Sequence, residues 1–183
     1  GALTLVSENP KQTYRITILD SPAVNAFALP GNRIGIYTGI MDLTSTDGQL
    51  ATIVGHEVAH VMLNHSAERY GRTTSTQLGV GLLGAVLESG GVSGASGIQQ
   101  AAGIGATYGL ILPFSRENEL EADAKGLEYM ARAGYNPREA VDFWEKMATA
   151  KSASGAPPEF MSTHPADARR IQQLEQMASS MGY

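Results

Sequence analysis

The chain lacks cysteine entirely, although it has 183 residues. This absence excludes disulfide bonds, thiolate metal ligands and a cysteine nucleophile. Basic runs are also missing and the formal net charge is -5, so we expect no nucleic-acid partner. Glycine, serine and glutamine interrupt the uncharged stretch over residues 89–115, so we expect no membrane span either.

The length and an ordinary hydrophobic content of 43% indicate a single domain over residues 1–183 with a sizeable core. The chain begins at Gly1 without methionine and shows no signal peptide, which suggests a processed or trimmed N-terminus. Residues 12–19 and 33–37 alternate in the manner of β-strands, and residues 25–29 form a short extended segment between them. These segments predict a small β-sheet.

Helices are expected over most of the remaining chain, so the predicted fold class is α+β and mostly helical. Periodicity and capping residues predict helices at residues 46–63, 77–88, 98–112, 117–133, from 137 onward and 165–181. Residues 71–109 hold eleven of the 21 glycines, and the two helices in this region would pack closely through glycine and alanine. The link over residues 89–97 is predicted to be a flexible loop, either a lid over an active site or an ordinary surface loop.

The strongest signal in the sequence is an HExxH element at residues 56–60. On a helix, His56 and His60 lie one turn apart on the same face and can bind one metal ion together. Glu57 lies beside them, where it can take a proton from a metal-bound water. The alternative is a buried helix that happens to carry two histidines. This helix is apolar nearly all round, and buried ionisable groups need a partner, which favours the metal.

Two carboxylates on the apolar side of the helix predicted at 117–133 form a second signal. At about 100° per residue, Glu119 and Asp123 fall inside the apolar arc. We interpret Glu119 as a zinc ligand and Asp123 as an outer carboxylate that accepts a hydrogen bond from a ligand histidine. The alternatives are a buried salt bridge of Glu119 with Arg170 and a structural hydrogen bond of Asp123 elsewhere. Glu121 is predicted to lie on the solvated face.

The other two histidines are interpreted differently. His65 is predicted to lie about 140° round the helix from His60, on its far side, and to interact with the helix dipole rather than with metal. The HExxHxxGxxH pattern is excluded, because the required glycine and third histidine are absent from their positions. His164 stands at the predicted start of the last helix, with Arg170 about two turns later. Each could donate a hydrogen bond to an oxyanion, or serve as a cap residue or a surface charge.

Together these motifs resemble one family of zinc peptidases, and the resemblance spans nearly the whole chain. The family contains the CAAX prenyl endopeptidases, the HtpX-like heat-shock peptidases, the mitochondrial inner-membrane stress protease Oma and the periplasmic β-barrel assembly-enhancing proteases. The segments that are similar to its motifs are residues 25–31, 36–39, 56–61 with His65, 115–123, 133–137, 163–165 and 170–171.

The resemblance implies a zincin-like domain that binds one Zn2+ per chain through His56, His60 and Glu119, with Glu57 as the general base. It makes Asp123 a partner of a zinc ligand. An edge strand of the small sheet would flank the active site and bind an extended protein or peptide substrate by strand addition. The residues implied for this contact are Asn25, Ala26 and Phe27.

The resemblance also makes His164 an active-site residue, which either stabilises the oxyanion or approaches the zinc in a resting form, with Arg170 supporting it. The implied function is that of a zinc-dependent endopeptidase acting on misfolded or envelope proteins in protein quality control. The alternative is a chaperone-like module that binds exposed strands and rarely cuts.

The chain lacks the spanning helices of the family's membrane-embedded members and the tetratricopeptide-repeat extension of many soluble ones. It therefore resembles the soluble, envelope-facing branch, which implies the periplasm of a bacterial cell envelope. Peripheral membrane association and the oligomeric state stay open.

Overall fold

The computed structural model describes residues 13–29, 31–106, 114–150, 158–165 and 167–183. Its elements are β1 (Arg15–Leu19), β2 (Ala26–Leu29), β3 (Arg33–Tyr37), α2 (Thr38–Met41), α3 (Asp47–Met62), α4 (His65–Ser89), α5 (Ala95–Ala106), α6 (Arg116–Arg132), α7 (Arg138–Thr149), α8 (Phe160–Thr163) and α9 (Ala168–Ser180). The predicted α+β, mostly helical class is confirmed. Gln12 of a predicted strand and residues 107–112 of a predicted helix lie outside the described residues.

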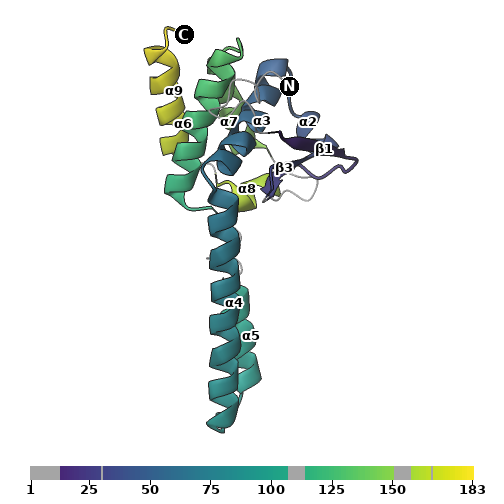
Figure 1. The fold of residues 1–183 in the computed structure, drawn as a ribbon, viewed down its shortest axis with the longest axis vertical. Coiled ribbons are helices and arrows are strands. Elements are labelled where there is room, and N and C mark those ends of the chain that lie inside the picture. The colour runs from purple at the N-terminus through teal and green to yellow at the C-terminus, as the bar shows by residue number, and fades with distance from the viewer. Residues whose placement is uncertain (1–12, 30, 107–113, 151–157, 166) are drawn as a thin grey trace.

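The molecule consists of a body and a projecting helical pair (Figure 1). In the body, α3 packs against α6 and α7, and α9 packs against α6 and α7, with the small sheet beside them. The buried apolar residues of these elements form one core, which includes Ile53, Leu127, Trp144 and Leu174. The helical pair consists of α4 and α5, which extend away from this core (Figure 1).

The sheet has the order β1-β3-β2, with β1 parallel and β2 antiparallel to the central strand β3. Gly31 and Asn32, which directly precede β3, have φ values of 82° and 59°, a region that glycine and asparagine adopt most readily. On β2, Ala26 is fully buried, whereas the ring of Phe27 covers Gly35 on the neighbouring strand. Among the described strands β2 pairs only with β3, so it is an edge strand, as predicted.

Helix α3 is the buried centre of the body. It begins after Thr46, whose hydroxyl accepts a hydrogen bond from the backbone N–H of Gln49 at 3.1 Å. Its closest neighbour is α6, and the two helices meet at Gly55 and Gly126. A Cβ atom on Gly126 would lie only 3.0 Å from backbone atoms of Gly55 and His56. The pair of glycines therefore permits an approach that larger residues would prevent.

Replacing Gly126 with alanine is expected to destabilise the protein by about 1–3 kcal/mol, because the new methyl group meets backbone atoms that cannot move independently. The matched control is Gly79→Ala on α4, where a Cβ atom meets nothing within 4 Å. That control should be neutral or stabilising by up to about 1 kcal/mol through helix propensity. Urea unfolding measures both free energies, and equal values for the two variants would contradict close packing at this crossing.

The α4–α5 hairpin differs from the prediction in two ways. Helix α4 begins at His65 rather than at residue 77, and the connection to α5 spans only residues 90–94. At 1.5 Å per residue, α4 is about 37 Å long, so this connection lies at the tip of the hairpin, far from the body (Figure 1). The lid hypothesis for residues 89–97 is therefore wrong.

The two helices of the hairpin do pack through glycine, as predicted. Gly84 lies against the side chain of Gln99, and Gly103 lies near Val80. No helix in the described part of the chain is both long enough and apolar enough to span a bilayer.

The C-terminal part also differs from the prediction. His164 does not begin the last helix but follows the short helix α8 as its C-terminal cap residue. Helix α9 begins later, because the side chain of Asp167 accepts hydrogen bonds from the backbone N–H groups of Arg169 and Arg170. Pro165 therefore lies in the connection between two helices.

Candidate metal site

Helix α3 presents His56 and His60 on one face, as the HExxH spacing predicts. Their Nε2 atoms lie 3.0 Å apart, and both residues are buried, with exposed fractions of 2% and 0%. Phe114 stacks on the ring of His60 with 4.1 Å between ring centroids. Two imidazole nitrogen atoms therefore point at one small volume inside the protein.

Helix α6 brings Glu119 to the same volume. A capping box between Ser115 and Asn118 begins this helix. Glu119 follows Asn118 directly and is the fourth residue of the helix. The two carboxylate oxygen atoms lie 3.4 Å from His56 Nε2 and 3.3 Å from His60 Nε2. The side chain is buried, so a charge brought here needs a cation.

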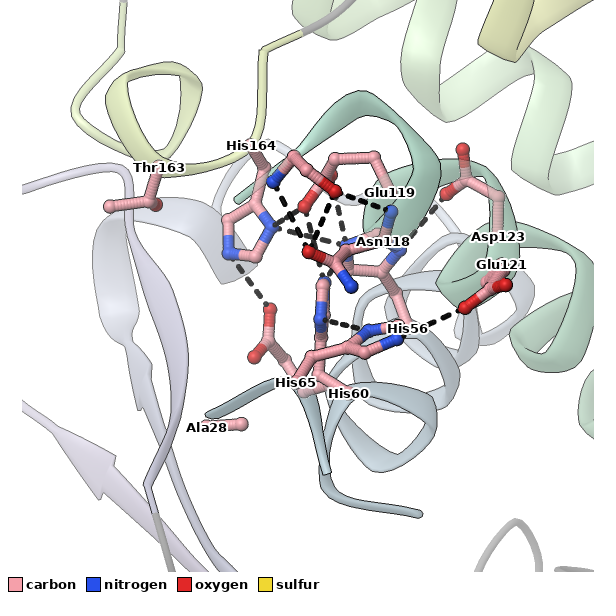
Figure 2. A network of polar contacts seen from close by, with 12 residues as sticks. Ala28, His56, His60, His65, Asn118, Glu119, Glu121, Asp123, Thr163 and His164 are labelled. Carbon is pink, nitrogen blue, oxygen red and sulfur yellow. Dashed lines mark hydrogen bonds and ion pairs between the residues drawn. The ribbon is translucent and has the colours of Figure 1, made fainter. Parts of the chain in front are cut away.

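His164 is the fourth member of the cluster (Figure 2). Its Nδ1 atom lies 3.1 Å from His56 Nε2 and 3.0 Å from a carboxylate oxygen of Glu119. The ring stacks on Phe160 at 4.4 Å, and the backbone of the preceding Thr163 accepts a hydrogen bond from the Phe114 N–H. The end of α8 is thus held against the face of α3 that carries the HExxH element.

The donor atoms of His56, His60, Glu119 and His164 lie within 4.8 Å of one another. Ligands bound tetrahedrally at about 2.1 Å from one ion lie roughly 3.4 Å apart, close to the observed 3.0–3.4 Å between these atoms. Nitrogen and carboxylate oxygen donors without thiolate are a set that zinc accepts. The residues present therefore fit a zinc ion.

Glu57 lies beside the cluster and is completely buried. Its Oε1 atom is 3.4 Å from His164 Nε2, and among the described residues neither of its carboxylate oxygen atoms has a hydrogen-bond partner. Burial raises the pKa of Glu57, although the neighbouring His164 and His56 oppose the shift. A raised pKa makes this carboxylate a stronger proton acceptor than an exposed glutamate, as suits a general base.

Asp123 holds His56 from the side opposite the cluster. Its Oδ1 atom lies 2.9 Å from His56 Nδ1, as predicted for an outer carboxylate. The guanidinium of Arg170 donates two hydrogen bonds to the same carboxylate, at 2.6 Å and 2.7 Å, and approaches Glu119 at 2.7 Å. It also lies 3.7 Å above the ring of Trp144. The salt bridge between Glu119 and Arg170 that we considered as an alternative therefore exists together with the ligand cluster.

The charges of the cluster shift the pKa values of its members. Burial would lower the pKa of His56, but the carboxylates of Glu119 and Asp123 outweigh it and raise the pKa to about 9. Burial lowers the pKa of His60 well below its usual value. Burial would raise the pKa of Glu119, but His164 and His56 hold it well below its usual range. Metal ions bind the neutral imidazole, so a bound ion would oppose this upward shift of the His56 pKa.

The predicted position of His65, on the far side of the helix from His60, is wrong. Helix α3 ends at Met62, and Asn64 takes a left-handed conformation at φ 59°, so the chain turns and His65 begins a new helix. Its Nδ1 atom lies 3.0 Å from His60 Nδ1, and its Nε2 atom lies 3.2 Å from Glu121 Oε2 (Figure 2). The asparagine was the available signal, because it adopts positive φ more readily than most residues.

The implied substrate residues lie on and next to the edge strand β2. Asn25 precedes the strand and donates a hydrogen bond to Glu159 at 3.1 Å. Ala26 is the first residue of the strand and is buried. Phe27 borders a cavity of about 340 Å³ between β2 and α4. Phe114 and Thr163, which contact the metal cluster or adjoin it, also line this cavity. The edge strand and the cavity are thus next to the cluster.

Two histidines on an HExxH helix, a glutamate from a second helix and a neighbouring carboxylate are the donor arrangement of metallopeptidases. The model of peptidase family M48 matches residues 3–178, and the chain belongs to this family.

Relatives from distant organisms support this assignment. The mitochondrial metalloendopeptidase OMA1 of Schizosaccharomyces pombe is 34% identical over 163 residues, which cover 89% of this chain and 46% of that protein. The human mitochondrial metalloendopeptidase OMA1 is 33% identical and is matched over 88% of this chain and 32% of its own length. The β-barrel assembly-enhancing protease of Escherichia coli K12 is 28% identical, with 93% and 36% covered. The chain thus spans less than half the length of each.

Proposed function

We propose that this protein is a zinc-dependent endopeptidase that hydrolyses peptide bonds of misfolded or envelope proteins in protein quality control. The main support is the convergence of His56, His60 and Glu119 from two helices beside the buried carboxylate of Glu57. The similarity to proteins named as metalloendopeptidases and as a β-barrel assembly-enhancing protease agrees with it.

In the proposed reaction, Glu57 accepts a proton from the attacking water and passes it to the leaving amine. A bound zinc ion would polarise the scissile carbonyl group and lower the pKa of that water. Burial of Glu57 serves this role, since its carboxylate oxygen atoms have no hydrogen-bond partner among the described residues that would hold them elsewhere.

His164 can act in two ways in this scheme. In the observed position its Nδ1 atom lies among the ligand atoms, which favours a fourth donor in a resting form. Rotated away from them, the same ring could donate a hydrogen bond to the substrate carbonyl oxygen as negative charge develops there. Arg170 is proposed to be a positioning residue, because its nitrogen atoms contact Asp123, Glu119 and the Pro165 carbonyl.

Substrates are proposed to bind in extended form along β2. A strand at the edge of a sheet offers backbone N–H and C=O groups to an added strand. The cavity beside Phe27 would then receive a substrate side chain, and its wall of Phe27, Leu29, Tyr70 and Phe114 favours an apolar one.

Removing the metal tests the proposed function directly. We expect the zinc-loaded protein to cleave unfolded casein, and treatment with a chelator such as 1,10-phenanthroline to abolish cleavage until zinc is restored. Elemental analysis should find one zinc ion per chain in the wild type and less in Glu119→Ala. Cleavage that continues without metal would contradict the proposal. Binding of casein without any cleavage would instead favour the chaperone-like module.

We propose the bacterial cell envelope as the place of action. The support is the similarity to β-barrel assembly-enhancing proteases of two bacteria. The relatives named as mitochondrial have somewhat higher identity, so the mitochondrion is the competing location. Fractionation of the source cells distinguishes the two.

A further inference from the structure

The two histidines of the HExxH element have different partners at Nδ1, the ring nitrogen that faces away from the cluster. On His56, the ring nitrogen that faces away from the cluster contacts Asp123. On His60, the corresponding Nδ1 atom contacts His65 at 3.0 Å, and His65 in turn contacts Glu121 at 3.2 Å. Ligand histidines generally donate their second N–H to a carboxylate or carbonyl partner, which fixes the ring and the tautomer. His60 differs from His56 in this respect, because a second imidazole, that of His65, lies between its ring and the carboxylate.

The protons of this chain of contacts have one arrangement that satisfies every member. If His60 binds metal through Nε2, its ring carries hydrogen on Nδ1 and donates it to His65 Nδ1. His65 then carries its own hydrogen on Nε2 and donates it to a carboxylate oxygen of Glu121. Each hydrogen bond is then donated toward the carboxylate, first from His60 to His65 and then from His65 to Glu121, so no two donors face each other.

We propose that His65 and Glu121 are positioning residues for the metal, which hold the ring of His60 with its Nε2 atom directed at the ion. This inference rests on the metal site of the proposed function. His65 is buried, with an exposed fraction of 3%, so its ring is fixed at the start of α4. Glu121 lies two residues after the ligand Glu119 on α6, and one helix therefore supplies both a ligand and the anchor of a second ligand.

His65 is not itself a ligand in this arrangement. Its Nδ1 atom faces the rear nitrogen of His60, and its Nε2 atom faces Glu121, so both nitrogen atoms are engaged outside the cluster. Its side chain also lies outside the group of donor atoms that come within 4.8 Å of one another. The role left for it is to orient His60.

Zinc affinity and the spectrum of the cobalt-substituted protein test this proposal without reference to peptidase activity. His65→Phe removes the acceptor for His60 at similar volume and should weaken zinc binding about 10–100-fold. His65→Asn places an amide oxygen near the former Nδ1 atom and should recover most of the affinity. Glu121→Ala removes only an exposed partner of His65 and should weaken zinc binding less than His65→Phe. The matched control is Glu117→Ala, at an exposed position on the same helix.

Zinc affinity is measured by competition with a chromophoric chelator, and the d–d bands of bound Co2+ report the ligand geometry. We expect changed bands for His65→Phe and wild-type bands for Glu117→Ala, with similar unfolding curves of all metal-free variants. Wild-type affinity and bands in His65→Phe would overturn the proposal, and so would an asparagine variant as weak as phenylalanine. If His65→Phe fails to fold, wild-type affinity in Glu121→Ala and full loss in His65→Asn together overturn it.

The same measurements separate this proposal from the proposed function. A wild-type protein that binds zinc with the expected dependence on His65 but cleaves no peptide supports the positioning role and contradicts the peptidase. A wild-type protein that binds no zinc overturns both.

Discussion

Glu57→Gln is expected to lower kcat for peptide cleavage by about 10²–10⁴-fold while the protein keeps its metal. Glutamine has nearly the volume of glutamate and fits the buried position beside His164. Its amide cannot accept a proton from water, so the general base is lost. The ligands His56, His60 and Glu119 are unchanged, and the zinc content should therefore remain one ion per chain. Single-turnover cleavage of a fluorogenic peptide and elemental analysis measure the two quantities.

The matched control for this substitution is Glu145→Gln, which makes the same chemical change on an exposed position of α7. Its kcat should equal that of the wild type. Full turnover by Glu57→Gln would show that another group takes the proton. Loss of zinc from Glu57→Gln would show instead that Glu57 contributes to metal binding, contrary to the role proposed here.

Arg170→Met is expected to reduce the free energy of unfolding by about 3–5 kcal/mol, the largest stability effect that we predict. The guanidinium is 2% exposed, and its removal leaves the buried carboxylates of Asp123 and Glu119 without their shared cation. Both pKa values are held below their usual range in the native protein, with Arg170 contributing directly at Asp123. The stacking of the guanidinium over Trp144 is lost as well. Urea unfolding of the metal-free protein measures the effect.

The neighbouring Arg169→Met is the control, because Arg169 is exposed and its substitution should change stability by no more than about 0.5 kcal/mol. Arg170→Lys should fall between the two, since lysine keeps the charge but cannot donate the paired hydrogen bonds that Asp123 receives. An unfolding midpoint of Arg170→Met equal to that of the wild type would refute a supporting role for this ion pair.

The residues of the site were largely predictable because each signal is local. The HExxH spacing places His56 and His60 on one face of any helix, whatever that helix packs against. Glu119 and Asp123 stood out because they interrupt the apolar side of an otherwise amphipathic helix, where an unpaired carboxylate is costly. The structure places Glu119 beside both histidines and Asp123 beside His56.

The errors have a common physical origin in single residues that redirect the chain. Extending the α3 helix past Asn64 placed His65 on the wrong side, whereas the left-handed conformation of Asn64 turns it toward His60. Pro165 does not begin the last helix, because Asp167 caps it two residues later by accepting hydrogen bonds from two backbone N–H groups. Periodicity reports which residues share a face of one element, and it is blind to a turn that starts a new element.

Helical spacing and the cost of a buried charge are properties of one segment, so they identify from the residues alone which side chains can act as ligands and base. Three features depend instead on how the segments pack: which ring nitrogen each partner contacts, the sharing of Arg170 by two carboxylates, and the contacts of His65 with His60 and Glu121. These contacts join α3, α4, α6 and α9, and their distances depend on helix crossings such as the one at Gly55 and Gly126. Such crossings arise from packing between segments far apart in the chain, which no local pattern records.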